Sequence, residues 1–523
     1  MAQVAPSSPD DLDPQAWRHI DPPSLTLADI VEAHARTRPQ HPALEDSDTV
    51  LDWQGFAAQV RSAAAALSAA GVAPGSRVLL LSGNSLKVYA LIFGAWRLGA
   101  IPVPVSPLLG PASLGRIIDD CTPAIGIFSD VLSELIGAAA QRSDHAVRLE
   151  ALSQFLFEEG QSADPAQVAP DTPATIIYSS GTTGQPKGIV HTHQARLWMA
   201  ASLAAGLRYS HRSRTLVSTP PFTNGSWVMI LPALINGSTI RFTSSFDPAE
   251  CLSLLDRGGI THSFFVPTQF TAMVVQPEWA SADFGKVETL LSAGAPLPPK
   301  LREAIDAKAP GKLHELWGLT EGLATIATPD DLQERPGTIG LPNGGSEIRL
   351  IDEDGSEVPR GEEGEIVGSS LGLMAGYLNV PEANEALLWH DPDGKVLLRT
   401  GDVASQDEDG YLYLRGRRKD MILSGGVNVY PIDIETVFLR HPAVIDVAVI
   451  GTPDEKWGER PVAFVRTREP ISADALVEWS LAHLDKYQRV AAIVNHERDF
   501  PRNALGKVQK NLLAESYTKR ISE

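Results

Sequence analysis

Short apolar stretches alternate with longer segments of helical period over the first two thirds of the chain. Residues 88–98 have the length and apolar pattern of a buried helix. Near-continuous apolar runs of strand length occur at residues 77–82, 100–105, 174–178, 259–266 and 289–292. Runs of this kind, alternating with helices, predict an α/β protein in which largely parallel sheets are covered by helices.

The pattern changes near residue 337. From there to 413, short strands such as 348–351 and 364–367 are separated by acidic, Gly-rich turns, which indicates a smaller antiparallel β-module. After residues 415–420 a segment with its own βαβ pattern follows, with strands expected at 444–450 and 460–465. We place the main domain boundary at 415–420.

Composition and charge narrow the class of protein. A length of 523 residues suggests several domains, and 43% hydrophobic with 21% charged residues is the balance of a soluble globular protein. No apolar run approaches the roughly 20 residues of a membrane helix. Residues 1–23 lack the basic start and apolar core of a secretory signal, so we predict a cytoplasmic protein. The net charge of −20 argues against nucleic acid as a partner.

Residues 178–188 concentrate hydroxyls, glycines and one lysine behind a predicted strand. Glycines let the backbone approach a bulky anion, hydroxyls donate to phosphate oxygens, and a lysine neutralises charge. The spacing is neither that of a Walker loop nor GxGxxG. A surface turn can share this composition, but the full string favours a phosphate loop. Its candidate ligands are Ser179, Ser180, Gly181, Thr182, Thr183, Gly184 and Lys187.

This string resembles the phosphate-binding signature of the adenylate-forming superfamily, which includes acyl- and aryl-CoA ligases, peptide-synthetase adenylation domains and beetle luciferases. Further motifs follow in the family's order between residues 30 and 510. The resemblance implies an AMP-forming carboxylate–CoA ligase of the acyl-/aryl-CoA synthetase branch. Such an enzyme joins ATP and a carboxylic acid into acyl-AMP and pyrophosphate, and then transfers the acyl group to the CoA thiol.

The resemblance also implies the architecture. We expect a large N-terminal domain (1–417) of two doubly wound, mostly parallel sheets plus the β-module, and a small mobile α+β C-terminal domain (421–523). The family places its hinge in 418–420, at Lys419. Rotation about this hinge would first bring a lysine to the site, and later the turn Ser424, Gly425 and Gly426 beside a thiol tunnel for CoA.

Two further motifs supply the catalytic groups by resemblance. In the stretch 317–321, Trp317 would flank the adenine, Gly318 would belong to the ATP/AMP site, Thr320 would bond the α-phosphate and Glu321 would hold Mg²⁺. Carboxylate attack on phosphorus builds charge on oxygens that hard cations and donors stabilise. Near the C-terminus, the motif's Gly-Lys maps the adenylation lysine to Lys507, with Lys510 as the near decoy.

The remaining nucleotide contacts follow from two other motifs. Asp402 would accept from both ribose hydroxyls, and Arg417 would add a second ribose or phosphate contact. A loop of small residues after a strand resembles the family's purine-edge loop. Its residues are Gly294, Ala295 and Pro296.

The acyl pocket is expected around residues 219–227 and 266–269. Thr223 stands where amino-acid-activating relatives carry an aspartate and many CoA ligases a histidine, so the residue that gates the pocket stays open. A largely apolar lining favours an aryl, arylalkanoic or medium-to-long aliphatic acid. The candidate lining residues are Phe222, Thr223, Asn224, Trp227, Val266 and Leu323.

Three alternatives remain at this point. The enzyme could load a carrier protein in trans, could be a non-catalytic acyl- or nucleotide-binding relative, or could oxidise its adenylate as luciferases do. Retention of Lys187, Glu321, Asp402, Arg417 and Lys507 speaks against a non-catalytic relative. The sequence leaves the oligomeric state open, with a homodimer among the alternatives.

Overall fold

A nine-stranded sheet forms the centre of the computed structural model, which describes residues 26–158, 160–179, 186–502 and 506–522. Its six middle strands run parallel, and the antiparallel strands lie at its edges. In spatial order they are β15 (Leu341–Pro342), β14 (Ala324–Ala327), β13 (Leu313–Gly318), β12 (Thr289–Ala293), β11 (His262–Phe265), β9 (Arg214–Val217), β10 (Thr239–Phe242), β1 (Pro42–Glu45) and β2 (Val50–Asp52).

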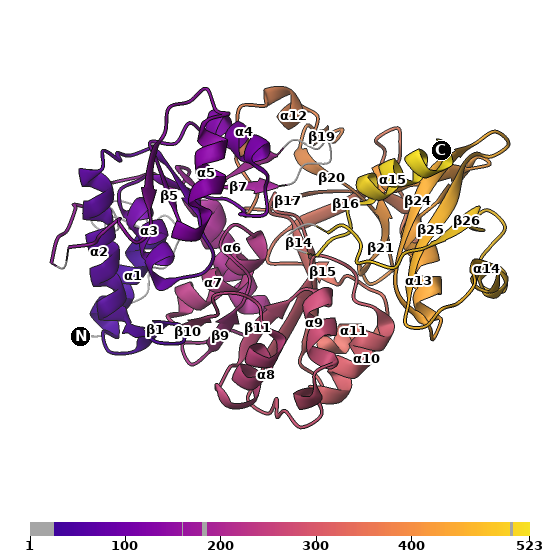
Figure 1. Ribbon diagram of the computed structural model, residues 1–523, viewed down its shortest axis with the longest axis horizontal. Coiled ribbons are helices and arrows are strands. Elements are labelled where there is room, and N and C mark those ends of the chain that lie inside the picture. The colour runs from indigo at the N-terminus through magenta and orange to yellow at the C-terminus, as the bar shows by residue number, and fades with distance from the viewer. Residues whose placement is uncertain (1–25, 159, 180–185, 503–505, 523) are drawn as a thin grey trace, which may run out of the picture.

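A second sheet, of four parallel strands, is formed by residues 77–151. Its order is β4 (Ile101–Pro104), β3 (Arg77–Leu81), β5 (Ile125–Phe128) and β6 (Arg148–Ala151). The helix α3 (Leu86–Arg97) is buried along almost its whole length, within a core shared with α2 (Trp53–Ala69) and α7 (Asn224–Asn236). The two mostly parallel sheets and the buried helix confirm the predicted α/β fold class (Figure 1).

One strand that was predicted to be parallel belongs to a separate antiparallel sheet. β7 (Pro173–Ser179), expected at 174–178 as another parallel strand, forms an antiparallel hairpin with β8 (Lys187–Thr192). The short β18 (Gly376–Tyr377) completes this three-stranded sheet. The apolar run of β7 fits both arrangements, and the short connection to β8 decides for the hairpin, since parallel neighbours need a long crossover.

The β-module is a five-stranded antiparallel sheet, as predicted. Its last strand continues to Arg417, beyond the expected end at 413. The strands are β16 (Glu347–Ile351), β17 (Glu363–Ser369), β20 (Val396–Gln406), β19 (Leu388–His390) and β21 (Leu412–Arg417).

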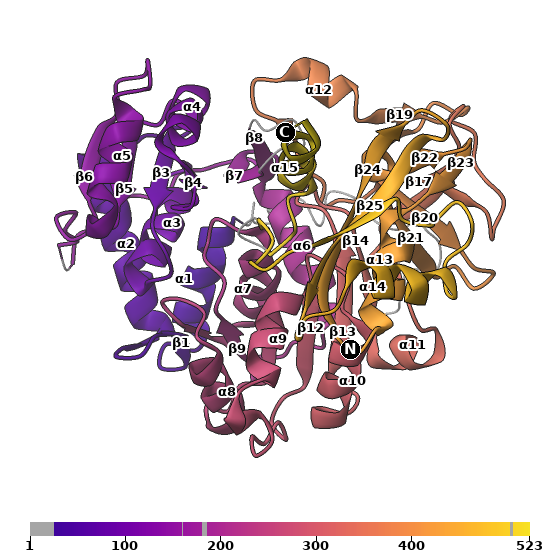
Figure 2. The same ribbon diagram turned by 45° about the vertical axis from the view of Figure 1, so that its right-hand side comes forward.

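The C-terminal residues build a separate sheet with its own apolar core at one end of the molecule (Figures 1 and 2). The strands expected at 444–450 and 460–465 are present as β24 (Val444–Asp454) and β25 (Gly458–Thr467), but they form a long antiparallel hairpin and are not linked by a helix. Only β26 (Ala492–Asn495) runs parallel to β25, after the crossover helix α14 (Ala473–Leu481). The other elements are β22 (Ile422–Ser424), β23 (Val427–Val429), α13 (Pro431–Arg440) and α15 (Lys510–Ser522).

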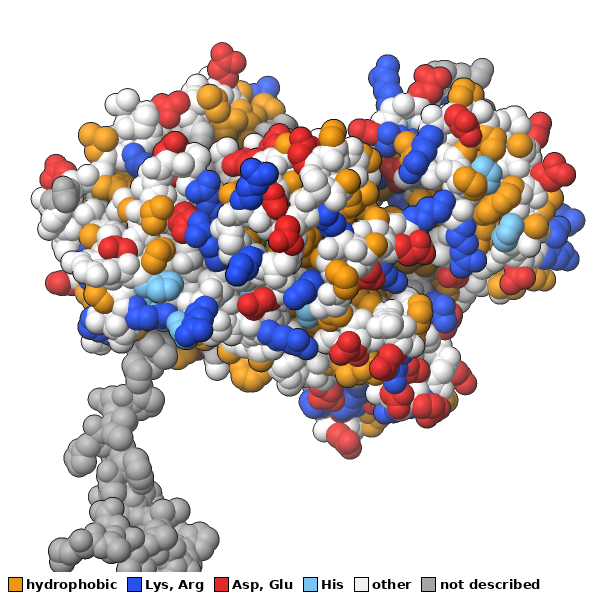
Figure 3. Space-filling view, turned by 90° about the horizontal axis from the view of Figure 1, so that it is seen from below, with side chains coloured by type: hydrophobic (Ala, Val, Ile, Leu, Met, Phe, Trp, Pro, Cys, Tyr) orange, Lys and Arg blue, Asp and Glu red, His pale blue; other side chains and the backbone are white. Residues whose placement is uncertain are grey.

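Acidic and basic side chains are interspersed over the face of the molecule seen in Figure 3. Among the described residues, no helix is both long and apolar enough to cross a membrane. The remaining helices are α1 (Leu27–Thr37), α4 (Pro111–Cys121), α5 (Ser133–Ala140), α6 (His193–Gly206), α8 (Pro248–Arg257), α9 (Pro267–Val274), α10 (Pro299–Lys308), α11 (Pro329–Glu334) and α12 (Pro381–Glu385), with short 3-10 turns at η2 (Asp130–Leu132), η3 (Pro277–Trp279) and η4 (Arg418–Asp420).

Candidate active site

The β7–β8 hairpin presents the predicted phosphate loop. Ser179 ends β7 and pairs in register with Lys187, the first residue of β8. The Lys187 ammonium lies 4.9 Å from the centre of the Tyr377 ring. The predicted ligands between these two strands, Ser180, Gly181, Thr182, Thr183 and Gly184, lie outside the described residues.

The Tyr377 side chain connects the phosphate loop to the second motif. Its hydroxyl donates to Glu321 Oε1 over 2.6 Å. Burial, followed by the neighbouring Glu321 carboxylate, raises the pKa of the Tyr377 phenol, so the hydroxyl stays a donor at neutral pH. Tyr377 was missed by sequence reasoning. It is contributed by β18, and only its pairing with β8 brings it to Lys187.

Trp317, the residue before the last in β13, is almost completely buried among apolar residues of the β-module. Its indole N–H donates to Asp402 Oδ2 over 2.9 Å. The side chain therefore ties the edge of the central sheet to the β-module through the carboxylate expected to hold ribose.

Asp402 lies in β20, opposite Arg417 of β21 in the strand register. Arg417 Nε lies 2.7 Å from Asp402 Oδ1, and the carboxylate side chain is 6% exposed. Burial raises the pKa of Asp402, while the charges of Arg417 and Lys507 and the Trp317 hydrogen bond oppose the rise. The structure thus brings together Trp317, Asp402, Arg417 and Lys507 from distant parts of the chain.

Lys507 reaches this cluster from the C-terminal domain. The preceding Gly506 lies against the β11–α9 turn, where an added Cβ would stand 2.8 Å from Thr268 Oγ1. Lys507 keeps part of its surface exposed, although protein surrounds most of its ammonium. Burial of the ammonium, and then repulsion by Arg417, lowers its pKa to about 8. The decoy Lys510 points to Glu435 instead, with Nζ 2.7 Å from Oε1.

The carboxyl ends of adjacent parallel strands meet at the same edge of the central sheet. The register pairs Ala293 of β12 with Leu316 of β13, so the loop of Gly294, Ala295 and Pro296 leaves the sheet at the same edge as the end of β13. In open α/β sheets, ligands bind in crevices at this edge. This placement suits the predicted purine-edge loop.

The predicted acyl-pocket residues come from three places: Phe222, Thr223, Asn224 and Trp227 lie at the start of α7, Val266 follows β11, and Leu323 precedes β14. Phe222, Thr223, Trp227, Val266 and Leu323 are all buried. Gly225 lets α7 approach β11, since an added Cβ would stand 2.6 Å from the Phe264 ring. The Thr223 hydroxyl donates to the Pro220 carbonyl over 3.0 Å, and so it stabilises the turn before α7.

The predicted CoA turn lies within the C-terminal domain. Gly425 and Gly426 both adopt positive φ, and the Gly425 N–H donates to the Trp457 carbonyl over 2.7 Å. Lys419 is exposed in η4, whose Arg418 is anchored by Glu365 at 3.0 Å.

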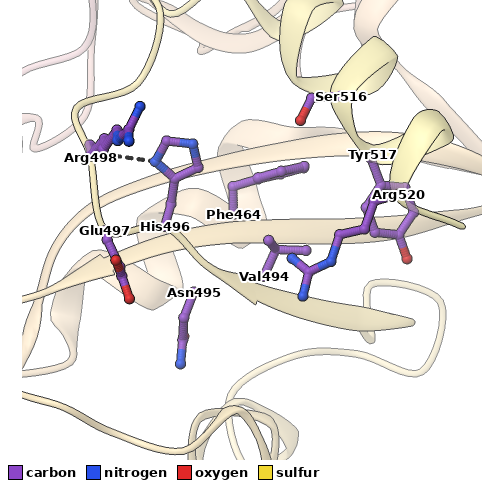
Figure 4. A pocket seen from close by; sticks show the side chains of 9 residues that line it. All are labelled: Phe464, Val494, Asn495, His496, Glu497, Arg498, Ser516, Tyr517 and Arg520. Carbon is purple, nitrogen blue, oxygen red and sulfur yellow. Dashed lines mark hydrogen bonds between the residues drawn. The ribbon is translucent and has the colours of Figure 1, made fainter. Parts of the chain in front are cut away.

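A cavity of about 260 Å³ also lies in the C-terminal domain, between β25, β26 and α15 (Figure 4). Its lining residues are Phe464, Val494, Asn495, His496, Glu497, Arg498, Ser516, Tyr517 and Arg520. None of them belongs to the predicted site.

Comparison with known proteins decides the family. Residues 31–378 match the family model described as AMP-binding enzyme, and residues 433–507 match the AMP-binding enzyme C-terminal domain. The chain belongs to the AMP-binding enzyme family. Its membership of the adenylate-forming superfamily is therefore confirmed.

Several characterised relatives match this chain along nearly their whole length. It is 33% identical to feruloyl-CoA synthase of an Amycolatopsis species (91% of this chain, 96% of the relative). It is 32% identical to indoleacetate–CoA ligase of Aromatoleum aromaticum, over 93% of this chain and 97% of that protein. Among solved structures, ATP-bound MatB from Rhodopseudomonas palustris superposes with a TM-score of 0.86 at 26% identity (94% and 99% of the two chains). These matches confirm the enzyme class, an AMP-forming acid–thiol ligase.

Proposed function

We propose that this ligase forms acyl-AMP at the cluster around Asp402 and then transfers the acyl group to CoA. The observation that carries the proposal is the convergence of Lys507 with Asp402 and Arg417. Lys507 belongs to the C-terminal domain, whereas its neighbours belong to the β-module. Such a convergence is what the adenylation step requires of a lysine that must reach a nucleotide.

In the proposed first step, Lys507 acts as a cation between two anions. The acid's carboxylate must approach the α-phosphate of ATP, and an ammonium between them offsets their repulsion. Asp402, held by Arg417 and Trp317, would accept from the ribose hydroxyls and fix the nucleotide. Thr320 would donate to an α-phosphate oxygen, while pyrophosphate leaves toward Lys187.

Glu321 fits the role of a Mg²⁺ ligand. Magnesium in nucleotide sites is held by one or two carboxylates together with substrate phosphates. Tyr377 occupies one Glu321 oxygen by hydrogen bonding and orients the group beside Lys187. When bound, Mg²⁺ would neutralise charge on the phosphate oxygens. Among the described residues no cluster of three or more His, Cys, Asp or Glu side chains offers another metal site.

The second step needs a different arrangement of the C-terminal domain. Lys507 and the turn at 424–426 belong to the same small domain, and one rigid position cannot present both at one site. We therefore propose that residues 418–420 form the hinge, with Lys419 as its pivot, between domains 1–417 and 421–523. Rotation there would withdraw Lys507 and bring Gly425 and Gly426 to the thiol path.

The acid itself is proposed to carry an apolar body. The buried and apolar Phe222, Trp227, Val266 and Leu323 would form a lining suited to aryl, arylalkanoic or aliphatic groups. The names of the relatives, feruloyl-CoA synthase and indoleacetate–CoA ligase, agree with that range. ATP and CoA are metabolites of the cell interior, which supports a cytoplasmic location.

A carboxylic-acid panel read out by pyrophosphate release, with and without CoA, tests this function. CoA-dependent thioester formation with at least one acid is expected. Thioester on an acyl carrier protein but not on CoA would favour carrier loading, the activity named for a 30% identical relative from Streptomyces coeruleorubidus, ScoC. Oxygen uptake without thioester formation would instead indicate an oxygenase. Absence of pyrophosphate with every acid would contradict the proposal.

A further inference from the structure

Arg196 of α6 is a cation buried in the body of the protein, with only 1% of its surface exposed. Nη1 donates to Asn224 Oδ1 over 2.7 Å and lies 3.6 Å from Met199 Sδ. Nε and Nη2 have no hydrogen-bond partner in the part of the chain that the structure describes. These two nitrogens carry three of the five N–H groups of a guanidinium.

Two other little-exposed arginines, Arg97 and Arg302, are paired with carboxylates. Arg97 Nη1 lies 3.1 Å from Glu32 Oε1, and Arg302 Nη2 lies 2.5 Å from Glu315 Oε1. For Arg196, no such pair exists among the described residues, and burial lowers the pKa of its guanidinium to about 9. The group is still charged at neutral pH. A buried charge without a counter-charge is unfavourable, so its retention needs a reason.

The guanidinium lies against the first turns of α7, which carry two of the predicted acyl-pocket residues. Its centre lies 5.8 Å from the centre of the Trp227 ring, and its hydrogen-bond partner Asn224 begins α7. His191, which feels the Arg196 charge, lies against the backbone of Thr320. Arg196 therefore contacts α7 on one side and is close enough to His191, the neighbour of Thr320, to affect its pKa.

The unpaired edge has a defined chemistry. Nε–H and Nη2–H of one guanidinium point in parallel, and together they match the two oxygens of a carboxylate. The neighbouring Met199 is an adaptable side chain that can yield space to a ligand. We propose that Arg196 is a specificity-determining residue that pairs with a second carboxylate of the acid, so that the preferred substrates are dicarboxylic acids with an apolar body. This inference rests on the proposed ligase function and narrows its substrate class.

Matched acids test the proposal. Adipate is compared with hexanoate and with the monoamide of adipate, and the three benzenedicarboxylates are compared with benzoate. The readout is kcat/KM for pyrophosphate release. For at least one pair, wild-type enzyme should prefer the dicarboxylate by about 100-fold or more, because a site built to bond a polar group rejects the analogue that lacks it.

Variants assign that preference to Arg196. Arg196→Met should remove most of it and improve use of the monocarboxylate, since the unpaired charge is gone. Arg196→Lys should keep a reduced preference for the dicarboxylate. Thermal unfolding shows whether each variant folds, and the lysine variant supplies the test if the methionine variant does not. Arg97→Met, which removes a little-exposed but carboxylate-paired arginine, should leave the ratio unchanged.

Each other outcome counts against the inference. A monocarboxylate or monoamide used as well as its dicarboxylate in every pair would overturn the assignment of a carboxylate partner. A dicarboxylate preference that survives in Arg196→Met would overturn the role of this residue. Activity with monocarboxylates alone would leave the ligase function intact, whereas inactivity toward every acid would contradict the ligase function itself.

Discussion

Replacing Asp402 by alanine should weaken ATP binding by a calculable amount. A carboxylate offers about four acceptor positions. Trp317 Nε1 and Arg417 Nε occupy two of them, at 2.9 and 2.7 Å. The remaining positions are available to the two ribose hydroxyls. Because a hydrogen bond to a charged group contributes about 1.5–3 kcal/mol, the loss of this contact should raise the Kd for ATP about 10- to 150-fold.

Isothermal titration with ATP measures this directly. Asp391 supplies a matched control, because it is a buried aspartate of the same β-module that pairs with Arg349 at 3.1 Å. Asp391→Ala should leave the Kd for ATP unchanged. Asp402→Asn retains an acceptor for Trp317 but loses the charge, and should give an intermediate Kd. An Asp402→Ala protein that binds ATP as tightly as wild type would show that this carboxylate only stabilises the β-module.

Three further predictions concern other parts of the site. Burial and Arg417 lower the pKa of Lys507 to about 8, so its ammonium is present below that pH and lost above it. The kcat/KM for adenylation should therefore fall above about pH 8. If Lys507→Arg showed an identical decline, the decline would belong to another group. Lys419→Pro fixes φ at the proposed hinge and should impair one half-reaction far more than the other; wild-type rates in both would place the pivot elsewhere. Tyr377→Phe deletes the hydroxyl that holds Glu321 and should raise the KM for MgATP by about 2- to 13-fold; an unchanged KM would make that bond structural.

Much of the architecture could be predicted because its signals are local. Apolar runs of strand length predicted β3, β4, β11 and β12, and acidic turns predicted the β-module. The errors concern pairing. An apolar run does not reveal whether its partner is parallel or antiparallel, so the antiparallel pairing of β7 with β8 and of β24 with β25 was missed.

Some residues of the candidate site could likewise be predicted from the sequence, and others could not. Lys187, Glu321, Asp402 and Lys507 lie in motifs that could be recognised from their spacing. Tyr377 and Arg196 lie in no such motif, and their roles depend on contacts with residues far away in sequence. The indole bond from Trp317 to Asp402 joins residues separated by 85 positions, and only the packing of β13 against the β-module creates it.

The half-reactions of Lys507→Ala test the central claim most directly. Pyrophosphate release from ATP and an accepted acid measures the first step, and thioester formation from synthetic acyl-AMP and CoA measures the second. Adenylation should fall at least about 100-fold, because the cation between carboxylate and phosphate is lost. Thioester formation should remain near wild type, and Lys510→Ala, whose lysine is paired with Glu435, should preserve both steps. Equal loss of both half-reactions in Lys507→Ala, or full retention of adenylation, would contradict the account.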